Sequence, residues 1–344
     1  MGRWESDALR PLRSGAAELG VQVLGRLGLP TREELRELAR MGVTTLDVAL
    51  VHRSPELLAD YLAFASRRIA VLSPVHLTPR QARARLHQLV DELLPPVEAA
   101  LVQSFLDEAI AMRPTGVRLD PQELDARAQV YLDHALAGRS EDAVAVVVDA
   151  ARAGTDLGTV LTGILEPAQR EIGQLWAAGA VTVAQEHYCT ALTQLALSAL
   201  HPYLFADRDE FGAGRRLVAV EAGGSLHHVG LRMVVDLLEH EGWDTTYLGA
   251  EPDPQRVVTA LVDRSADVLA ISASMPSEVG AVAAVVSAVR ADRRTAAVKV
   301  VVGGRAFLVA PALARDVGAD GLARDAREAV ALCARLTETG DVAV

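Results

Sequence analysis

The sequence predicts an all-α N-terminal region and a four-helix bundle, followed by an α/β domain built on a doubly wound parallel sheet. Three observations support this. Residues 1–118 are helical in pattern but irregular, residues 119–205 keep apolar side chains at helical spacing, and residues 213–344 alternate apolar runs with amphipathic segments. The polar segment 206–212 is the expected linker. With 344 residues, the chain has room for two or three domains, each with its own core.

The N-terminal region is predicted to form short helices of uncertain role. Residues 9–27 are amphipathic, and Thr31 is expected to cap a helix whose first turn carries Glu33 and Glu34. Thr78-Pro79 marks another helix start, since proline suits a first turn. Prolines cut the region at Pro30, Pro74, Pro79, Pro95 and Pro96. There is no convincing helix-turn-helix followed by a basic wing, so a DNA-reading head is not expected.

Four helices are expected in the middle region, at 121–137, 141–153, 157–176 and 182–204. The third has apolar side chains at helical spacing, namely Leu157, Val160, Leu161, Ile164, Leu165, Ala168, Ile172, Leu175 and Trp176. Because the connections between these helices are short, an antiparallel bundle is favoured.

The C-terminal region predicts five strands, at 216–221, 244–248, 267–272, 298–302 and 319–322. Helices are expected between and after them, at 227–240, 254–263, 278–290, 306–314 and 325–336. The strands are nearly continuous apolar runs, as in a sheet covered on both faces. Right-handed crossovers then give a flavodoxin-like strand order with a ligand crevice at the carboxyl ends of the strands.

Composition excludes several classes of function. The net charge of -11 opposes nonspecific nucleic-acid binding, and Lys299 is the only lysine, so neither a phosphate-binding Gly-Lys-Ser/Thr loop nor a Schiff-base lysine is expected. The chain has no apolar run long enough to cross a membrane and no hydrophobic signal region at Met1, which predicts a cytoplasmic protein. Cys189 and Cys333 lie too far apart for a metal motif and are expected to be small buried side chains.

Polar and glycine residues gather after the predicted strands. Ser225, His227 and Gly230 follow the first strand, Ser272 and Ser274 follow the third, and Gly303-Gly304 follow the fourth. Imidazole is a suitable cobalt ligand, and glycine lets a ligand approach the backbone closely. Taken singly, His227 would suit a surface or capping histidine and the glycine pair a tight turn. Their common placement at strand ends favours a site.

This His-x-x-Gly, Ser and Gly-Gly series resembles the cobalamin-binding domain of methionine synthases, mutases and B12 photoreceptors. The resemblance implies that His227 binds cobalt from below, while Ser272, Ser274, Gly303 and Gly304 line the slot for the nucleotide tail. The family usually has Asp or Glu where this chain has Ser225, so we expect a weaker lower ligand. His228 is the less favoured ligand because it breaks the spacing.

The middle region carries a second motif, Trp176 followed after nine residues by Glu186-His187. It resembles the helical cap of light-sensing B12 proteins similar to CarH, which implies that the bundle 119–205 covers the upper face of the corrin around an adenosyl group. In DNA-binding relatives a histidine follows the tryptophan, whereas this chain has Ala177, so a bis-histidine photoproduct through that position is not expected.

The N-terminal region is compatible with the photocobilins, B12 photoreceptors that also hold a bilin such as biliverdin. Candidate partners for bilin propionates or pyrrole nitrogens are Arg67, Arg68, Arg80, Arg83, Arg85, His76, His87 and His134. Each of these would equally suit a solvated helix face.

The leading interpretation is an adenosylcobalamin-binding light sensor. Photolysis of its cobalt–carbon bond would shift the bundle and change association with itself, as a homo-oligomer, or with an unidentified protein partner. The alternative is a corrinoid carrier subunit of a methyltransferase system. A mutase is disfavoured because the chain has no (β/α)8 region, and a plain cobalamin store would share every motif. Whether the chain is an enzyme stays open, with a photoreceptor favoured.

Overall fold

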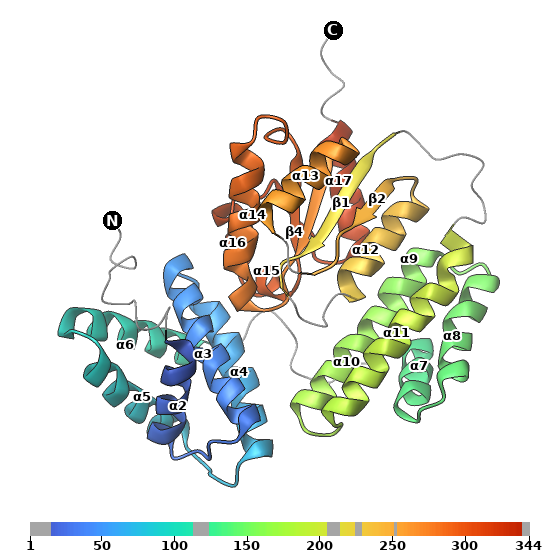
Figure 1. The fold of residues 1–344 in the computed structure, drawn as a ribbon. Helices are drawn as coiled ribbons and strands as arrows, with labels where there is room; N and C mark the ends of the chain where they lie inside the picture. The colour runs from blue at the N-terminus through green and yellow to red at the C-terminus, as the bar shows by residue number, and fades with distance from the viewer. Residues whose placement is uncertain (1–14, 113–123, 205–213, 224–228, 251–252, 339–344) are drawn as a thin grey trace. The chain divides into compact units, whose positions relative to one another are not determined.

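The computed structural model describes residues 15–112, 124–204, 214–223, 229–250 and 253–338. The chain divides into two compact units, of which the first comprises residues 1–117 with Ala177–Gly179 and the second comprises residues 118–176 and 180–344. The described part of the second unit holds a helical bundle and a five-stranded sheet (Figure 1). This architecture confirms the predicted fold class.

The first unit is helical throughout its described elements. These are α2 (Ala16–Leu27), α3 (Glu33–His52), α4 (Pro55–Leu72), α5 (Pro79–Leu93) and α6 (Pro96–Ala111). Leucines of α2 and α3 pack with Tyr61 of α4, whose hydroxyl donates to the carbonyl oxygen of Leu38. Three helices begin with proline at the first or second position, as its fixed φ allows.

The helix starts test two sequence predictions. The helix start predicted at Thr78-Pro79 is confirmed, and the side chains of the N-cap residue Thr78 and of Gln81 form a reciprocal capping box. The predicted Thr31 cap is wrong. Arg32 holds the N-cap position of α3 without a side-chain hydrogen bond, which leaves Thr31 one residue outside the helix. The acidic first turn of α3, with Glu33 and Glu34, is confirmed.

The bundle consists of α7 (Ala126–Leu136), α8 (Ser140–Arg152), a long third helix and α11 (Val183–Leu204). The third helix runs as α9 (Leu157–Val160), a π-helical turn η3 (Leu161–Leu165) and α10 (Glu166–Ala177). The first helix begins at Ala126 rather than at the predicted Pro121, because the Asp125 side chain accepts a hydrogen bond from the Arg127 amide and caps it there.

The sheet is entirely parallel, with strand order β2-β1-β3-β4-β5, which is the predicted flavodoxin-like order. Its strands are β1 (Arg216–Glu221), β2 (Asp244–Tyr247), β3 (Val268–Ser272), β4 (Lys299–Gly303) and β5 (Gly321–Leu322). The surrounding helices are α12 (Val229–His240), α13 (Pro254–Arg264), the short 3-10 turn η4 (Pro276–Glu278), α14 (Val279–Ala291), α15 (Arg305–Val309), α16 (Ala312–Asp316) and α17 (Ala326–Glu338).

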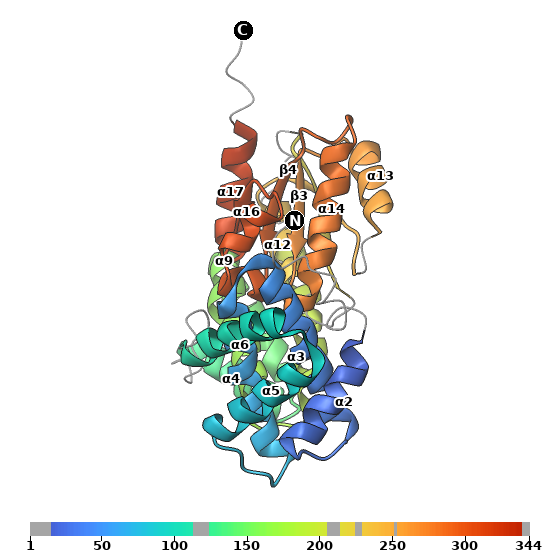
Figure 2. The same ribbon diagram turned by 90° about the vertical axis from the view of Figure 1, so that its left-hand side faces the viewer.

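Helices cover both faces of the sheet. Side chains of α12 and α17 pack on the face that carries Leu217, Ala219 and Ala270. Figure 2 shows α13 and α14 on the opposite side of the sheet from α17. The predicted helix 306–314 is instead two short helices, α15 and α16. Ala310, which precedes Pro311, lies outside the helical region of backbone angles, since a residue before proline disfavours that region.

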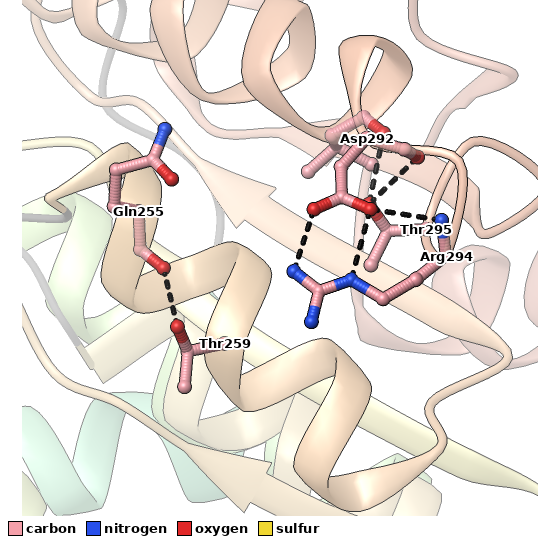
Figure 3. Close-up of polar contacts among 6 residues, drawn as sticks. Gln255, Thr259, Asp292, Arg294 and Thr295 are labelled. Atoms are coloured by element: carbon pink, nitrogen blue, oxygen red, sulfur yellow. Dashed lines mark hydrogen bonds and ion pairs between the residues drawn. The ribbon is translucent and has the colours of Figure 1, made fainter.

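The turn after α14 is held by its own polar groups (Figure 3). Arg294 donates to Asp292 from its backbone amide and its guanidinium, which lowers the pKa of Asp292 to about 2. The buried Thr295 hydroxyl donates to the carbonyl oxygen of Val289, 2.9 Å away. Since α14 starts beside the carboxyl ends of the strands, this turn lies at the opposite edge, and its polar residues are explained by the turn itself.

Candidate functional site

The strand order reverses between the neighbouring strands β1 and β3. The chain continues from β1 to β2 on one side of this pair and from β3 to β4 on the other. In open parallel sheets, ligands bind in the crevice at the carboxyl ends of two such strands. The register places Glu221 of β1 beside Ser272 of β3, and Ser272 beside Gly303 of β4. Two of the predicted site residues, Ser272 and Gly303, therefore lie side by side at this edge.

The three residues also share one face of the sheet. Side chains alternate along a strand, and Ala219, Ala270 and Val301, two residues earlier in each strand, pack against α12 and α17. Glu221, Ser272 and Gly303 therefore continue the same rows on the α12 and α17 side. We call this set the crevice row.

Gly304 is required by the fold itself. It has a φ of +91°, and a Cβ there would overlap the backbone of Ala273, 2.7 Å from its carbonyl carbon and 2.8 Å from its nitrogen. The loops after β3 and β4 touch at this point, and the Ala306 amide donates to the Ala273 carbonyl oxygen. At Gly303 a Cβ would lie 3.2 Å from the carbonyl oxygen of Ala323. The glycine pair thus lets three loops meet beside the crevice.

Ser274 lies in a loop fixed by Glu278. A carboxylate oxygen of Glu278 accepts hydrogen bonds from the amides of Ser274, at 2.7 Å, and Met275, at 3.0 Å. A Cβ on Gly223 would overlap the same carboxylate, so the turn after β1 passes directly beside it. Glu278 therefore connects the loops that follow β1 and β3.

Glu221 is a residue of this edge that sequence reasoning missed. It is buried with 3 % of its surface exposed, and its Oε1 has no hydrogen-bond partner in the described part of the chain. Burial raises the pKa of Glu221 to about 8, and the Glu278 carboxylate adds to the rise. Burial, with a smaller effect of Glu221, raises the pKa of Tyr247 to about 12. The available signal was one acidic residue at the end of the apolar run from Leu217 to Val220.

Ser225, His227 and His228 lie outside the described residues, so their roles stay predictions. Gly230 lies in the first turn of α12 and is exposed. A Cβ at Gly230 would meet no heavy atom within 4 Å, so there is open space around this position.

The second motif brings Trp176 to the end of α10 and Glu186 with His187 to the first turn of α11. Trp176 is half-buried, and Ala177 beside it is buried. Thr182 and Gln185 form a reciprocal capping box that fixes the start of α11 at the predicted position.

A chain of hydrogen bonds links this helix start to α10. Glu186 contacts the exposed His187 ring through Oε2, at 2.6 Å, and accepts from the Thr190 hydroxyl through Oε1, at 3.2 Å. Gln169 of α10 donates to the same Thr190 hydroxyl at 3.2 Å. The carboxylate of Glu186 is thus held in place while His187 stays accessible to solvent.

The bundle and the sheet half share a hydrophobic core. Val229, Met233 and Leu237 of α12 and Ala326 of α17 belong to the same buried cluster as the bundle core. Arg327 of α17 pairs with Asp156, the N-cap residue of α9, and donates to the Thr159 hydroxyl at 2.6 Å. The π-helical turn begins one helical turn beyond this ion pair.

Most of the basic residues proposed for a bilin have partners within the protein. Arg83 and His87 both contact Asp107, and Arg85 donates to the carbonyl oxygen of Leu27. His134 belongs to the bundle, where it accepts from Arg139. Arg67 and Arg68 also have interaction partners, whereas His76 and Arg80 are exposed.

Cys189 and Cys333 are buried free thiols whose pKa values burial raises to about 11 and about 12, as expected of structural cysteines. Within the described ranges, three or more His, Cys, Asp or Glu side chains nowhere form a group that could hold a metal ion. Among the helices that the structure describes, none combines the length and apolar character that a membrane crossing requires.

Comparisons with known proteins identify both halves of the second unit. Residues 215–332 match the B12 binding domain family, and residues 128–201 match a second family of the same description. No curated protein matches the chain. These family matches support cobalamin binding.

Solved structures add the likeness in fold. The monomethylamine corrinoid protein of Methanosarcina barkeri is 20% identical, with a TM-score of 0.53 over 62% of this chain and 97% of its own. A cobalamin-binding protein from Desulfitobacterium hafniense DCB-2 is 21% identical, with a TM-score of 0.36 over 62% and 98% of the two chains. The methanol:cobalamin methyltransferase complex of Methanosarcina barkeri is 17% identical, with a TM-score of 0.35 over 78% and 96%. The first of these has a similar fold over the 62% of this chain that it covers.

Proposed function

We propose that this chain, which carries B12-binding domains, is an adenosylcobalamin-binding light sensor that changes its association with itself or with a protein partner. The observation that carries the proposal is the motif at the junction of α10 and α11. There Trp176 lies in the last turn of α10, and Glu186, held through Thr190, lies in the first turn of α11. A flat aromatic side chain at the end of one helix, with a fixed carboxylate and an accessible imidazole at the start of the next, suits a ligand with an aromatic base and a ribose.

The sheet edge fits a corrinoid on three observations. The crevice row lies at the point where the strand order reverses, and two of its members, Ser272 and Gly303, are small. The space around Gly230 is open. Glu221 offers a buried oxygen that has no hydrogen-bond partner among the described residues.

Within this proposal, His227 is the lower cobalt ligand and Ser225 orients its ring. Ser272, with Ser274, offers hydroxyl groups to the nucleotide tail, while Gly303 and Gly304 let the backbone approach it. When bound, the cofactor supplies a cobalt–carbon bond that visible light breaks. The protein's task is then to hold the adenosyl group in the dark and to respond when it leaves.

The shared core provides a route for that response. Loss of a ligand held by Trp176 and Glu186 changes the packing of α10 and α11, and the bundle core continues into α12 through Met233 and Leu237. A two-state element of this kind couples a local event to a surface that a partner can bind. A bilin held by the N-terminal helices is a further component of this proposal.

Illumination gives the direct test. The full chain, loaded with adenosylcobalamin in the dark, should change its visible spectrum under green light and then elute differently from a gel-filtration column. Protein loaded with hydroxocobalamin has no cobalt–carbon bond and should change in neither measurement. Identical spectra and elution volumes before and after light would rule out the sensor.

A His227→Ala variant tests the lower ligand. Cobalamin uptake should fall by about tenfold or more, and the absorption bands of any bound cofactor should shift, because the cobalt loses its imidazole. His228→Ala is the matched control and should bind as the unaltered protein does. Unchanged uptake and bands in His227→Ala would contradict the assignment.

A corrinoid carrier for a methyltransferase is the second candidate, favoured by the fold shared with the monomethylamine corrinoid protein. Mass spectrometry of cofactors extracted from protein purified in the dark separates the two. An adenosyl ligand supports the sensor and a methyl ligand the carrier. The same spectra reveal a bilin if one is bound.

A further inference from the structure

Glu221 has an unusual position for an acidic residue. Only 3 % of the surface of Glu221 is exposed, and its Oε1 has no hydrogen-bond partner among the described residues. A buried polar atom without a partner costs free energy, so most such atoms are satisfied by protein, water or ligand. An acid at the end of an apolar strand therefore needs an explanation.

The location of Glu221 points to a ligand. Glu221 and Ser272 stand side by side on β1 and β3, the two strands between which the strand order reverses. Alternation along β1 turns the Glu221 side chain to the α12 and α17 face, in the crevice row. The carboxyl group thus stands where a ligand in this crevice would reach.

The surrounding charges restrict the chemistry of that ligand. Glu278 presents a second carboxylate beside the turn after β1, and its influence on Glu221 is repulsive. An anionic group placed beside the Glu278 carboxylate would be disfavoured. Because burial raises the pKa of Glu221 to about 8, the acid keeps its proton at neutral pH and can both donate and accept a hydrogen bond.

We propose that Glu221 is a specificity-determining residue of the crevice, which hydrogen-bonds an uncharged polar group of the corrinoid's nucleotide tail, while the neighbouring Glu278 carboxylate disfavours an anionic group there. Hydroxyl, amide and ring-nitrogen groups fit this chemistry, whereas the tail phosphate does not. The inference rests on the cobalamin binding proposed above and names the part of the cofactor that reaches β1.

The test compares two corrinoids and two variants in the full chain, in the dark. Cobinamide lacks the nucleotide tail, so only cobalamin can contact Glu221. Glu221→Leu should weaken cobalamin binding by about tenfold and leave cobinamide binding unchanged, whereas Glu221→Gln should keep cobalamin affinity within about threefold. Asp236→Asn, at a buried acid in the middle of α12, is the control and should leave both affinities unchanged.

Thermal unfolding of the cofactor-free protein gives a second readout. Glu221→Leu removes a buried oxygen that has no partner within the described ranges, so its unfolding temperature should be no lower than that of the unaltered chain while its cobalamin affinity falls. If Glu221 had a purely structural role, Glu221→Leu would lower both the unfolding temperature and the affinity for both corrinoids. That result overturns the inference. Equal cobalamin affinity in Glu221→Leu and the unaltered chain also overturns it. An unaltered chain that bound neither corrinoid would overturn cobalamin binding itself.

Discussion

A Gly304→Ala variant should lose about 3 kcal/mol of unfolding free energy, measured by urea denaturation of the cofactor-free protein. Two costs add. An alanine at a φ of +91° is strained, and its Cβ would overlap the backbone of Ala273, which cannot move aside as a flexible side chain would. The loops after β3 and β4 would have to separate, and Ser274 and Gly303 would be displaced with them.

The control for this variant is Gly280→Ala. Gly280 is an exposed residue near the start of α14, where a Cβ would meet no heavy atom within 4 Å, so the substitution should be neutral or slightly stabilising. If Gly304→Ala were as stable as Gly280→Ala, the contact between the two loops would not be as close as the structure has it.

Raising the pH from 5 to 8 should lower the unfolding free energy of the cofactor-free protein by a few kcal/mol, at roughly 1.4 kcal/mol for each unit of pKa difference. The folded-state pKa of Glu221 is about 8, above its ordinary value of 4.5, so the folded state holds a proton that the unfolded state releases. Stability is therefore greatest below the unfolded-state pKa. It falls as pH rises, until Glu221 ionises in the folded state near pH 8.

Other groups contribute to this pH dependence and must be separated. Glu278 and Tyr247 face Glu221, and Arg232 lies near enough to Tyr247 to influence it. Asp236, with a pKa raised by burial to about 6, adds a loss of the same sign at lower pH. Urea denaturation of Glu221→Gln from pH 5 to 8 should therefore lose the Glu221 contribution and retain that of Asp236. Parallel curves for Glu221→Gln and the unaltered chain would contradict the assignment.

Local patterns predicted much of the fold. The order of the sheet follows from five apolar runs with intervening helices, and Thr78 caps its helix because its spacing to Gln81 is a local property. Competing local choices explain the errors. The N-cap of α3 is Arg32, one residue after the predicted Thr31. The first bundle helix begins later than predicted because Asp125 caps it, and Pro311 lies at the break between the two short helices α15 and α16.

The candidate site was only partly accessible to sequence reasoning. Ser272 and Gly303 could be placed at strand ends, since carboxyl ends of parallel strands share an edge. Glu221 could not be recognised, because its raised pKa arises from burial and from Glu278, 57 positions away by residue number, and the lack of a partner for its Oε1 among the described residues is a property of the folded chain. The strain at Gly304 likewise depends on a tertiary contact with Ala273.

The cluster that joins Met233 and Leu237 to the bundle has a consequence for protein engineering. In a chimera that joined these four helices to a foreign sheet, the bundle would lose its contacts with the apolar side chains of α12. Those side chains of α12 would become exposed in the sheet domain left behind. Because they expose this apolar surface, such chimeras should precipitate unless α12 is transferred with the four helices or the foreign sheet domain supplies equivalent aliphatic residues. The smallest part of the chain that should be transferred intact is therefore the whole second unit.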